Sequence, residues 1–586
     1  MIQSKRVLFR QCAASVRMGV FTLIVLASLF ILTTAIAHII DSSFGSLDVE
    51  TVRIPDGDHE LSGLLYRPHA ATPDNPVPAV VLVHGISSAK ESMSSIALEL
   101  ARRGFVALTI DAVGHGDSGG RLGAGDFSLG ALSALRFLES QPYVNASSLG
   151  LVGHSLGAGA VRAAAATHGH IKAVVLIAGG LGGVASDPVA YGVLNSTFPE
   201  NLLVAIGRQD VLFDLSQVTG DFLPPVFGVS QVVPGRIYGD FASGTARKLI
   251  APATTHLLEP LDPTIVSETV LWMGSALKPD GAGGIEQLDG GLVYPYREAA
   301  MLLSIFTLIG LVFPISLLFL PRKSLNMLEA RGEHGFLSDW IITVVWGALS
   351  ILLLIPMFLL GFAVSFPPVL FGSSIAWWML TVAAAGLLLV VFALPRFFRI
   401  RLEMRMLVKE SFRLQEVLIA ISLFLLLQFI TSLMSLLGLK LWIFIPIFRV
   451  LSAPRTILFF MFIPFFLIFF YVEGIYLHVL CWQGERKGLL SEVLAMGKTI
   501  GIKIAPYILV MGIQYVPMFL LEVKTFSSTI GFLIEFIPLI TVQFIMSTAC
   551  SRWLHRVSSS IGAGAVFNTL LFAWISAGVF PFGVFR

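Results

Sequence analysis

A five-residue stretch, Gly153-His154-Ser155-Leu156-Gly157, constrains the fold of this chain more than any other part of the sequence. It follows an apolar run that begins at Leu149, and it precedes an Ala-rich segment of helical composition at 158–167. This order predicts a strand, a sharp turn and a helix, with the serine at the apex of the turn. A side chain at either glycine would collide with the neighbouring strand or helix. The helix N-terminus would direct backbone N–H groups at a forming oxyanion, so the stretch predicts a nucleophilic serine.

Composition divides the chain into two unlike parts. Of the 586 residues, 55% are hydrophobic and only 13% are charged, whereas soluble domains carry about 25% charged residues. Polar and turn-forming residues gather at 48–278, while 298–586 consists of apolar runs with short charged breaks. The net charge of +2 says nothing about nucleic acid, but the polar part has no basic patch, so no nucleic-acid partner is predicted. The three cysteines, Cys12, Cys481 and Cys550, lie in or beside apolar segments and predict neither a disulfide framework nor a metal site.

The N-terminus has the pattern of a membrane anchor. Residues 1–17 carry four basic side chains and no acid, and residues 18–40 are almost wholly apolar. At about 1.5 Å per residue, this run is long enough to cross a hydrocarbon core of about 30 Å. The alternative is a cleaved signal peptide, because Ala35-Ile36-Ala37 fits a cleavage site. An uncleaved anchor leaves 1–17 in the cytoplasm, and either interpretation places residue 48 onward outside it.

Strand and helix patterns alternate through 48–278, which predicts a mostly parallel sheet flanked by helices. The first two strands are joined by Pro55-Asp56-Gly57 and predict a hairpin. The predicted strands are 49–54, 61–66, 78–83, 105–110, 148–152, 171–177, 201–206 and 248–251, and the other predicted helices are 91–103, 127–140 and 263–276. Two further stretches, 179–200 and 216–247, are interpreted as insertions that could shape a substrate pocket.

Four motifs stand at predicted strand ends in this part of the chain. They are His84-Gly85-Ile86, the stretch DAVGHGDS at 111–118, the serine turn at 153–157, and Gly207-Arg208-Gln209-Asp210, with His256 further along the chain. Their order resembles the α/β-hydrolase superfamily, in which the nucleophile, the acid and the histidine follow one another in the chain. The resemblance covers 48–278 and not the rest.

These positions predict a serine-hydrolase mechanism. Ser155 would be the nucleophile, His256 would take and return its proton, and Asp210 would orient the imidazole. The backbone N–H groups of Ile86 and Leu156 would form the oxyanion hole. Neither a metal nor an organic cofactor is required by such a mechanism.

Several residues compete for these roles. Asp214 is the alternative acid, and His168 and His170 are the alternative bases, although the two histidines close the helix at the wrong end of the sheet. The sharp turn at 153–157, which we call the elbow, is interpreted as shaped by Gly153 and Gly157. The loop beside it is interpreted as shaped by His84 and Gly85. His154 is expected to point away from the site, and His115 to have a structural role. Asp111 and Ser118 are expected to pin their loop by hydrogen bonds.

The second part of the chain predicts a membrane domain. A Gly/Pro-rich linker at 279–297 leads into about eight apolar spans, which with the first segment make nine. The eight spans are 299–320, 338–364, 375–394, 416–437, 456–480, 504–522, 528–549 and 560–584. Basic residues concentrate in the loops that would be cytoplasmic if residue 1 is cytoplasmic, which predicts an extracytoplasmic hydrolase domain at the plasma membrane. Among polar residues at membrane depth, Glu535 is the stronger functional candidate, ahead of Glu473 and His478.

Together these patterns predict a membrane-bound serine hydrolase that cleaves an ester, thioester or amide. A catalytic domain held at a bilayer favours a lipid or lipid-linked acyl substrate, with the bilayer itself as partner. Three alternatives stay open. The protein could be an extracytoplasmic peptidase or small-ester esterase anchored by the bundle. It could be an acyltransferase that uses the same triad. It could also be a transporter or assembly factor with an inactive hydrolase fold.

Overall fold

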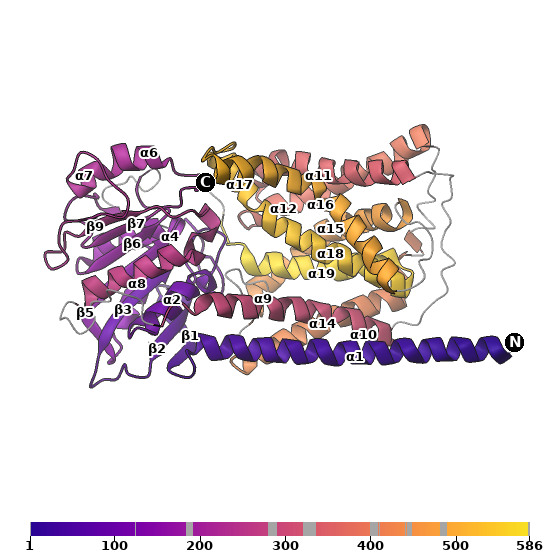
Figure 1. The fold of residues 1–586 in the computed structure, drawn as a ribbon, viewed down its shortest axis with the longest axis horizontal. Helices are drawn as coiled ribbons and strands as arrows, with labels where there is room; N and C mark the ends of the chain where they lie inside the picture. Colours follow the sequence, from indigo (N-terminus) through magenta and orange to yellow (C-terminus); the bar gives the residue numbers. More distant parts are fainter. Residues whose placement is uncertain are drawn as a thin grey trace.

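Two parts of different composition lie end to end in the computed structural model of this protein, an α/β domain on the left and a helical bundle on the right of Figure 1. The structure describes residues 2–123, 125–182, 191–278, 290–319, 336–398, 408–409, 411–439, 441, 448–480 and 489–583. The C-terminal end of the described chain lies at the junction of the two parts, and the N-terminus lies at the far end of the bundle.

A nine-stranded sheet forms the α/β domain, in the order β1-β2-β4-β3-β5-β6-β7-β9-β8. The strands are β1 Leu47–Asp56, β2 His59–Pro68, β3 Val77–Val83, β4 Val106–Ile110, β5 Val144–His154, β6 Ala173–Ile177, β7 Leu202–Ala205, β8 Ile237–Tyr238 and β9 Arg247–Ile250. The central run from β4 to β9 is parallel, and β1, β2 and β8 pair antiparallel at the edges. The predicted opening hairpin is β1–β2; the short edge strand β8 was not predicted.

Helices cover both faces of the sheet because its central strands are apolar on both faces. In β3, Val80 and Leu82 pack with α2 (Ser94–Ala101) and α8 (Pro263–Leu277), while Val81 and Val83 pack with α3 (Ala131–Glu139) and α4 (Leu156–His168). This alternation follows from the two-residue period of a strand. The predicted fold class, a mostly parallel sheet flanked by helices and joined to a helical membrane bundle, is confirmed.

Two predicted boundaries differ from the structure for local reasons. The helix predicted at 127–140 begins only at Ala131, because the Asp126 carboxylate accepts hydrogen bonds from the N–H groups of Ser128 and Gly130 and Gly130 has a φ of 92°. The helix predicted at 91–103 begins as a 3₁₀ turn, Lys90–Met93, before α2.

The two predicted insertions differ in how much of them the structure describes. The second, 216–247, follows the start of the short α6 (Leu215–Gln217) and contains η3 (Val218–Phe222), α7 (Leu223–Phe227) and β8. In the first, 179–200, residues 183–190 lie outside the described residues.

The described residues contain nine helical spans long and apolar enough to cross a membrane, the number predicted from the sequence. They are Arg17–Asp41, Tyr294–Phe319, Val344–Val364, Gly372–Phe392, Leu414–Leu436, Ala453–His478, Val493–Leu520, Ser528–Ser558 and Ile561–Val579. The protein is therefore a multi-pass membrane protein. The helix α9 (Tyr294–Gly310) begins inside the predicted linker 279–297, because Pro295 occupies its first turn, where a missing N–H costs nothing. Residues 279–289 of that linker lie outside the described residues.

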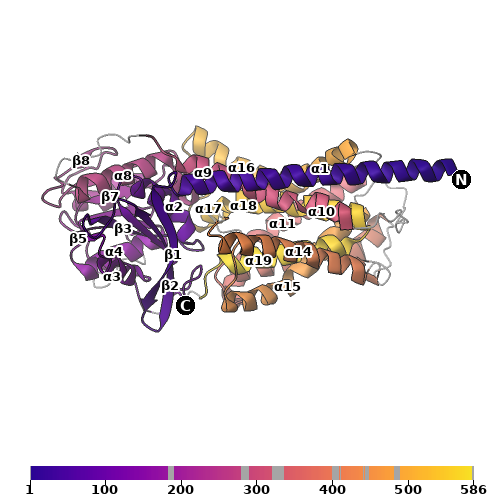
Figure 2. The same cartoon turned by 90° about the horizontal axis from the view of Figure 1, so that it is seen from below.

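A buried polar cluster joins the first helix, the bundle and the sheet. Helix α1 (Ile2–Asp41) and α9 lie side by side (Figures 1 and 2). Arg297 of α9 donates to the carboxylate of Asp41 at 2.8 Å and to the hydroxyl of Ser94 at 2.9 Å. The Tyr66 hydroxyl of β2 donates to the same Asp41 carboxylate at 3.0 Å. The helix that precedes the α/β domain and the helix that follows it are therefore joined to each other by the Arg297 guanidinium, beside the sheet.

We expect Arg297→Ala to destabilise the whole chain. The substitution leaves the buried Asp41 carboxylate without its cation, which typically costs about 3–5 kcal/mol. The matched control is Arg136→Ala, because Arg136 is exposed. Thermal unfolding of detergent-solubilised protein, followed by intrinsic fluorescence, should show a clear drop in Tm for Arg297→Ala alone. Equal midpoints for the two variants would contradict this account of the junction.

Candidate active site

Ser155 occupies the sharp turn between β5 and α4. Its backbone has φ 53° and ψ −115°, a conformation that a serine adopts only when its surroundings enforce it. A Cβ at Gly153 would lie 2.2 Å from the Gly157 carbonyl oxygen, and one at Gly157 would lie 2.2 Å from the Val83 carbonyl oxygen. The close approach of strand, turn and helix therefore requires both glycines.

Ser155, His256 and Asp210 form one chain of hydrogen bonds, although they lie on three different loops. The His256 Nε2 atom lies 2.9 Å from the Ser155 hydroxyl, and its Nδ1 atom lies 2.8 Å from the Asp210 carboxylate. Asp210 follows β7, and His256 opens the 3₁₀ turn His256–Leu261 (η4) after β9. His256 and Asp210 are almost completely buried. The structure thus brings together the three side chains for which the sequence predicted nucleophile, base and acid.

The pKa of His256 is set by burial and by two nearby carboxylates, of which Asp210 has the larger effect and Glu535 the smaller. Burial disfavours the imidazolium and lowers the pKa, but the Asp210 carboxylate favours it, and the net result is a pKa above the usual 6.5. Since Nδ1 faces the carboxylate, Nδ1 carries the proton of the neutral ring and Nε2 is free to accept the serine proton. The arrangement is suited to general-base chemistry at Ser155.

The loop predicted to supply an oxyanion donor lies against the serine. Ile86 lines the same cavity as Ser155 and His256, and Leu156 is the first residue of α4. Among the turn and loop hydrogen bonds of the described residues, none uses the N–H group of either residue. A Cβ at Gly85 would lie 2.9 Å from the His154 Nδ1 atom and 3.1 Å from the Ser155 Cβ, so a larger residue here would crowd both side chains. His84 is buried and binds the Gly85 carbonyl through Nδ1 and the Ala112 N–H through Nε2, which fixes the loop.

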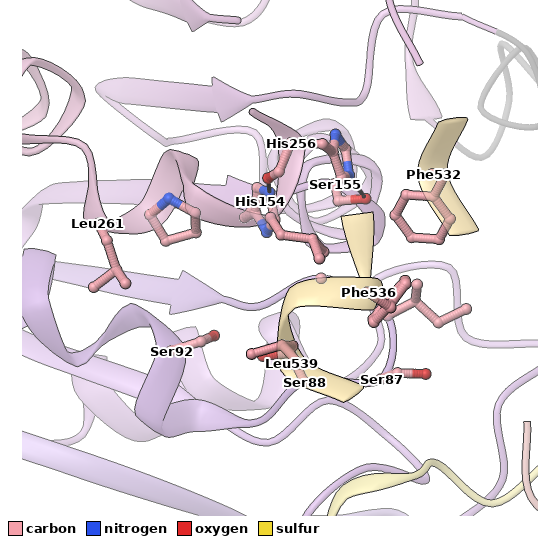
Figure 3. A pocket seen from close by; sticks show the side chains of 14 residues that line it. Ser87, Ser88, Ser92, His154, Ser155, His256, Leu261, Phe532, Phe536 and Leu539 are labelled. Atoms are coloured by element: carbon pink, nitrogen blue, oxygen red, sulfur yellow. Dashed lines mark hydrogen bonds between the residues drawn. The ribbon is translucent and has the colours of Figure 1, made fainter. Parts of the chain in front are cut away.

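The expectation that His154 points away from the site is wrong. His154 lines the cavity beside Ser155 (Figure 3). Its Nε2 atom donates to the carbonyl oxygen of His256 at 3.0 Å, and the two rings lie 5.1 Å apart. Burial holds the pKa of His154 well below its usual value, so the ring is neutral. The ring therefore supports the backbone of His256. This position depends on how the turn after β5 packs against η4, which the order of residues in the sequence does not reveal.

The competing residues lie away from the triad. Asp214 accepts hydrogen bonds from Ser216 at the start of α6, and it is Asp210 that contacts His256. His168, at the far end of α4, lies 2.9 Å from Glu139. His115 binds the Val113 carbonyl oxygen within its own turn. The His170 ring meets the His168 ring edge to face at that same far end, with centroids 6.3 Å apart.

Asp111 pins the 111–118 loop through several contacts, as its position in the motif predicted. The carboxylate accepts from the Lys90 ammonium at 2.6 Å and from the Asp117 N–H at 2.8 Å. The Ser118 hydroxyl donates to the Asp111 carbonyl oxygen at 2.6 Å. Burial alone would raise the pKa of Asp111, but the cations of Lys90 and Arg449 outweigh it and hold that pKa well below its usual range.

Glu259 is a buried residue of the site that sequence reasoning missed. Its Oε1 atom accepts from the Gly207 N–H at 2.6 Å and thereby holds the turn that carries Asp210. Burial raises the pKa of Glu259 well above its usual value, and the Asp210 carboxylate raises it further. No motif marks it, because it is one of several acids near the histidine in the sequence.

The membrane bundle supplies one wall of the cavity, which sequence reasoning also missed. Phe532, Phe536 and Leu539 line it together with Ser155 and His256 (Figure 3). They come from α17 (Ser528–Glu535) and α18 (Ile537–Ser558) and the break between them. The Phe532 ring meets the His256 ring edge to face, with centroids 5.5 Å apart. No local sequence pattern indicates that these residues lie near Ser155, because they are hundreds of residues away in the chain. The sequence analysis had marked this segment only through Glu535, a polar residue at membrane depth.

Three side chains of the site have the residue types of metal ligands. Potential ligand atoms of His154, His256 and Glu259 lie within 4.8 Å of one another. Both His256 nitrogens are used by Ser155 and Asp210, and His154 Nε2 bears the hydrogen bonded to the His256 carbonyl. A metal would have to displace these bonds, so the donor set does not fit one and we assign no metal here.

Comparison with known proteins gives the class of the domain. Residues 74–210 match the model of the family described as Serine aminopeptidase, S33. Two solved structures of the Pyrococcus furiosus esterase Pf2001 are similar, at 20% and 17% identity and TM-scores of 0.32 and 0.31. Each of the two matches covers 40% of this chain. The matched regions make up 96% and 94% of the two esterase chains.

Curated relatives cover a smaller share. Two proteins from two strains of Mycobacterium tuberculosis, whose names provisionally assign them as phosphoribosyl transferases, are each 27% identical over 215 residues. The match covers 36% of this chain and 42% of theirs, so the chain spans less than half the length of these relatives.

The sheet order, the helices on both faces and the match to the S33 family agree. This protein contains a domain of the α/β-hydrolase superfamily, as the four motifs indicated. The comparisons identify no closer family. The domain is joined to a helical bundle with the composition of a multi-pass membrane protein.

We expect Asp210→Asn to abolish most activity and to move the pH profile. Loss of the carboxylate removes the correct tautomer of His256 and should lower kcat by about 10⁴-fold. It also removes the larger of the two carboxylate effects that raise the His256 pKa, so the acid limb should move to lower pH, because the neutral base then persists in more acidic solution. The rate of inactivation by a fluorophosphonate, measured from pH 5 to 9 (about the range in which histidine titrates), reports both.

Asp214→Asn is the matched control, because Asp214 is the same residue type four positions along the chain and accepts its hydrogen bonds from Ser216 of α6, not from His256. It should behave as wild type. An unchanged acid limb in Asp210→Asn, or a loss of activity in both variants, would contradict the assignment of the acid.

Proposed function

We propose that this protein is a membrane-bound serine hydrolase that cleaves an acyl ester, thioester or amide through an acyl-enzyme. The observation that carries the proposal is the continuous hydrogen-bonded chain from the Ser155 hydroxyl through His256 to the Asp210 carboxylate. The S33 match and the α/β-hydrolase fold support hydrolytic chemistry at this serine.

The steps follow from the positions of these side chains. The Ser155 oxygen attacks the substrate carbonyl carbon while its proton moves to His256 Nε2. The N–H groups of Ile86 and Leu156 stabilise the oxyanion, at about 3–4 kcal/mol per donor. The C–O, C–S or C–N bond then breaks, and the leaving group takes the proton from His256. A water molecule, deprotonated by His256, attacks the acyl-enzyme and releases the acid.

The walls of the cavity support an apolar acyl substrate. Leu257, Leu261 and Ile86 of the hydrolase domain line it, and the bundle adds Phe532, Phe536 and Leu539. That wall belongs to helices long and apolar enough to span a membrane, so the cavity adjoins the part of the protein that would lie in the bilayer. We therefore propose a membrane lipid or lipid-linked acyl ester as the substrate class.

An aminopeptidase is the second candidate, because the matching family is described as Serine aminopeptidase. Such an enzyme needs a negative group to hold the substrate's ammonium. No acidic side chain is among the described residues that line the cavity, which favours the acyl ester. The phosphoribosyl transferase name of the mycobacterial proteins is not extended to this chain, since the match covers less than half of them.

The proposed location of the hydrolase domain is the extracytoplasmic side of the plasma membrane, with the N-terminus in the cytoplasm. Its support is the distribution of basic residues: 1–17, 395–415 and 481–503 are rich in Lys and Arg, whereas 365–374 has none. Loops that stay in the cytoplasm carry this excess.

We expect the purified full-length protein to prefer long-chain acyl esters in mixed micelles over short-chain soluble esters. Each methylene buried against an apolar wall contributes about 0.8 kcal/mol, so the kcat/KM ratio should exceed about tenfold for a chain longer by several carbons. Aminoacyl amides should be poor substrates, and Ser155→Ala should remove all turnover. Higher kcat/KM for aminoacyl amides than for acyl esters would instead support the aminopeptidase.

A further inference from the structure

One segment of the bundle reaches both loops that carry the histidine and the acid of the triad. We call residues 522–539 the docking segment; it comprises the turn after α16 (Leu489–Leu520), α17 and the start of α18. The Lys524 ammonium donates to the carbonyl oxygens of Asp210 and Phe213. The Ser528 N–H donates to the carbonyl oxygen of Val211 at 2.8 Å. These contacts fix the backbone of the loop from which Asp210 projects.

Glu535 of the same segment reaches the histidine loop. Its Oε2 atom accepts from the N–H group of Leu257 at 3.1 Å. Leu257 directly follows His256 and is the second residue of the turn η4. Glu535 is 3% exposed and is the last residue of α17, where the helix breaks before α18. Burying a carboxylate at such a break is costly unless the carboxylate has a hydrogen-bond partner, and here that partner is the Leu257 N–H group.

The two sets of contacts act on a single distance. Asp210 and His256 meet across 2.8 Å, yet they belong to loops after two different strands, β7 and β9. The docking segment holds the first loop through Lys524 and Ser528 and the second through Glu535 and the Phe532 ring. The gap between imidazole and carboxylate therefore depends on a part of the bundle that lies hundreds of residues away in the chain.

We propose that Glu535 is a positioning residue of the hydrolase site, and that the membrane bundle thereby completes the triad by holding the His256 loop in register with Asp210. The inference rests on the proposed serine-hydrolase function and adds a residue to it. Glu535 acts through Leu257 and not on the substrate. Its side-chain oxygen acts as an acceptor, so an amide oxygen in the same place can replace it.

The test compares Glu535→Ala with Glu535→Gln in the detergent-solubilised full chain, using a short-chain soluble ester. Hydrogen bonds to charged acceptors are worth about 1.5–3 kcal/mol, so loss of the acceptor should lower kcat by about 10- to 100-fold. KM should stay close to the wild-type value, because Glu535 does not line the cavity. Glu535→Gln keeps an acceptor and should recover kcat to within about threefold. Rates are given per active serine, counted by fluorophosphonate titration, so misfolded protein is not included.

Glu522→Gln is the matched control, since Glu522 lies in the same segment but is exposed, and its ion pair with Arg208 is long at 3.6 Å. It should turn over as wild type. If Glu535→Ala does not fold, Glu535→Asp replaces it, because withdrawing the carboxylate by one methylene should also lower kcat at constant KM.

Wild-type kcat in Glu535→Ala or in Glu535→Asp would overturn the inference, as would a Gln variant as impaired as the Ala variant. An inactive, unlabelled wild type would overturn the proposed function and the inference with it. An active wild type with unaffected Glu535 variants would overturn the inference alone.

Discussion

The hydrogen bond between His256 and Ser155 is the contact on which the rest of this structure depends. It joins a loop after β9 to a turn after β5, and its length is 2.9 Å. A parallel sheet makes this possible, because the carboxyl ends of its strands meet at one edge and bring together loops that are far apart in sequence. The strained backbone of Ser155 and the missing side chains of Gly153 and Gly157 place the hydroxyl at that edge.

The bundle contacts the same edge at several loops. Arg449 pairs with Glu91 of the 3₁₀ turn Lys90–Met93 at 2.8 Å and lies beside Asp117. Arg455 donates to the Gly116 carbonyl oxygen. The two arginines thus hold the turn after β3 and the loop after β4. Lys524 and Glu535 hold the loops after β7 and β9. The catalytic edge of the sheet therefore faces the membrane part of the protein (Figure 1), with an apolar wall between them. In the proposed function, this geometry brings a bilayer-borne acyl chain to the serine.

Features with a local cause were predictable from the sequence. The glycines dictate the sharp turn at 153–157, apolar runs mark most of the strands along the chain, and length and composition mark the nine spans. Contacts made across loops were not. The hydrogen bond from His154 to the His256 carbonyl oxygen and that from the Gly207 N–H to Glu259 depend on how the loops pack. The spacing of residues in the sequence does not predict such packing. The wall from Phe532 and Phe536 depends on how the two parts dock, and only the cost of burying Glu535 in a membrane helix hinted at it.

The most direct test of the central claim is covalent labelling of sealed cells with a membrane-impermeant fluorophosphonate, followed by mass spectrometry of the adduct. If Ser155 is the activated nucleophile on the extracytoplasmic side, the adduct lies on Ser155 in wild type and is absent in Ser155→Ala. Labelling only after permeabilisation would contradict the proposed side of the membrane. An unlabelled Ser155 in permeabilised cells, or an adduct on another residue, would contradict the account of the site.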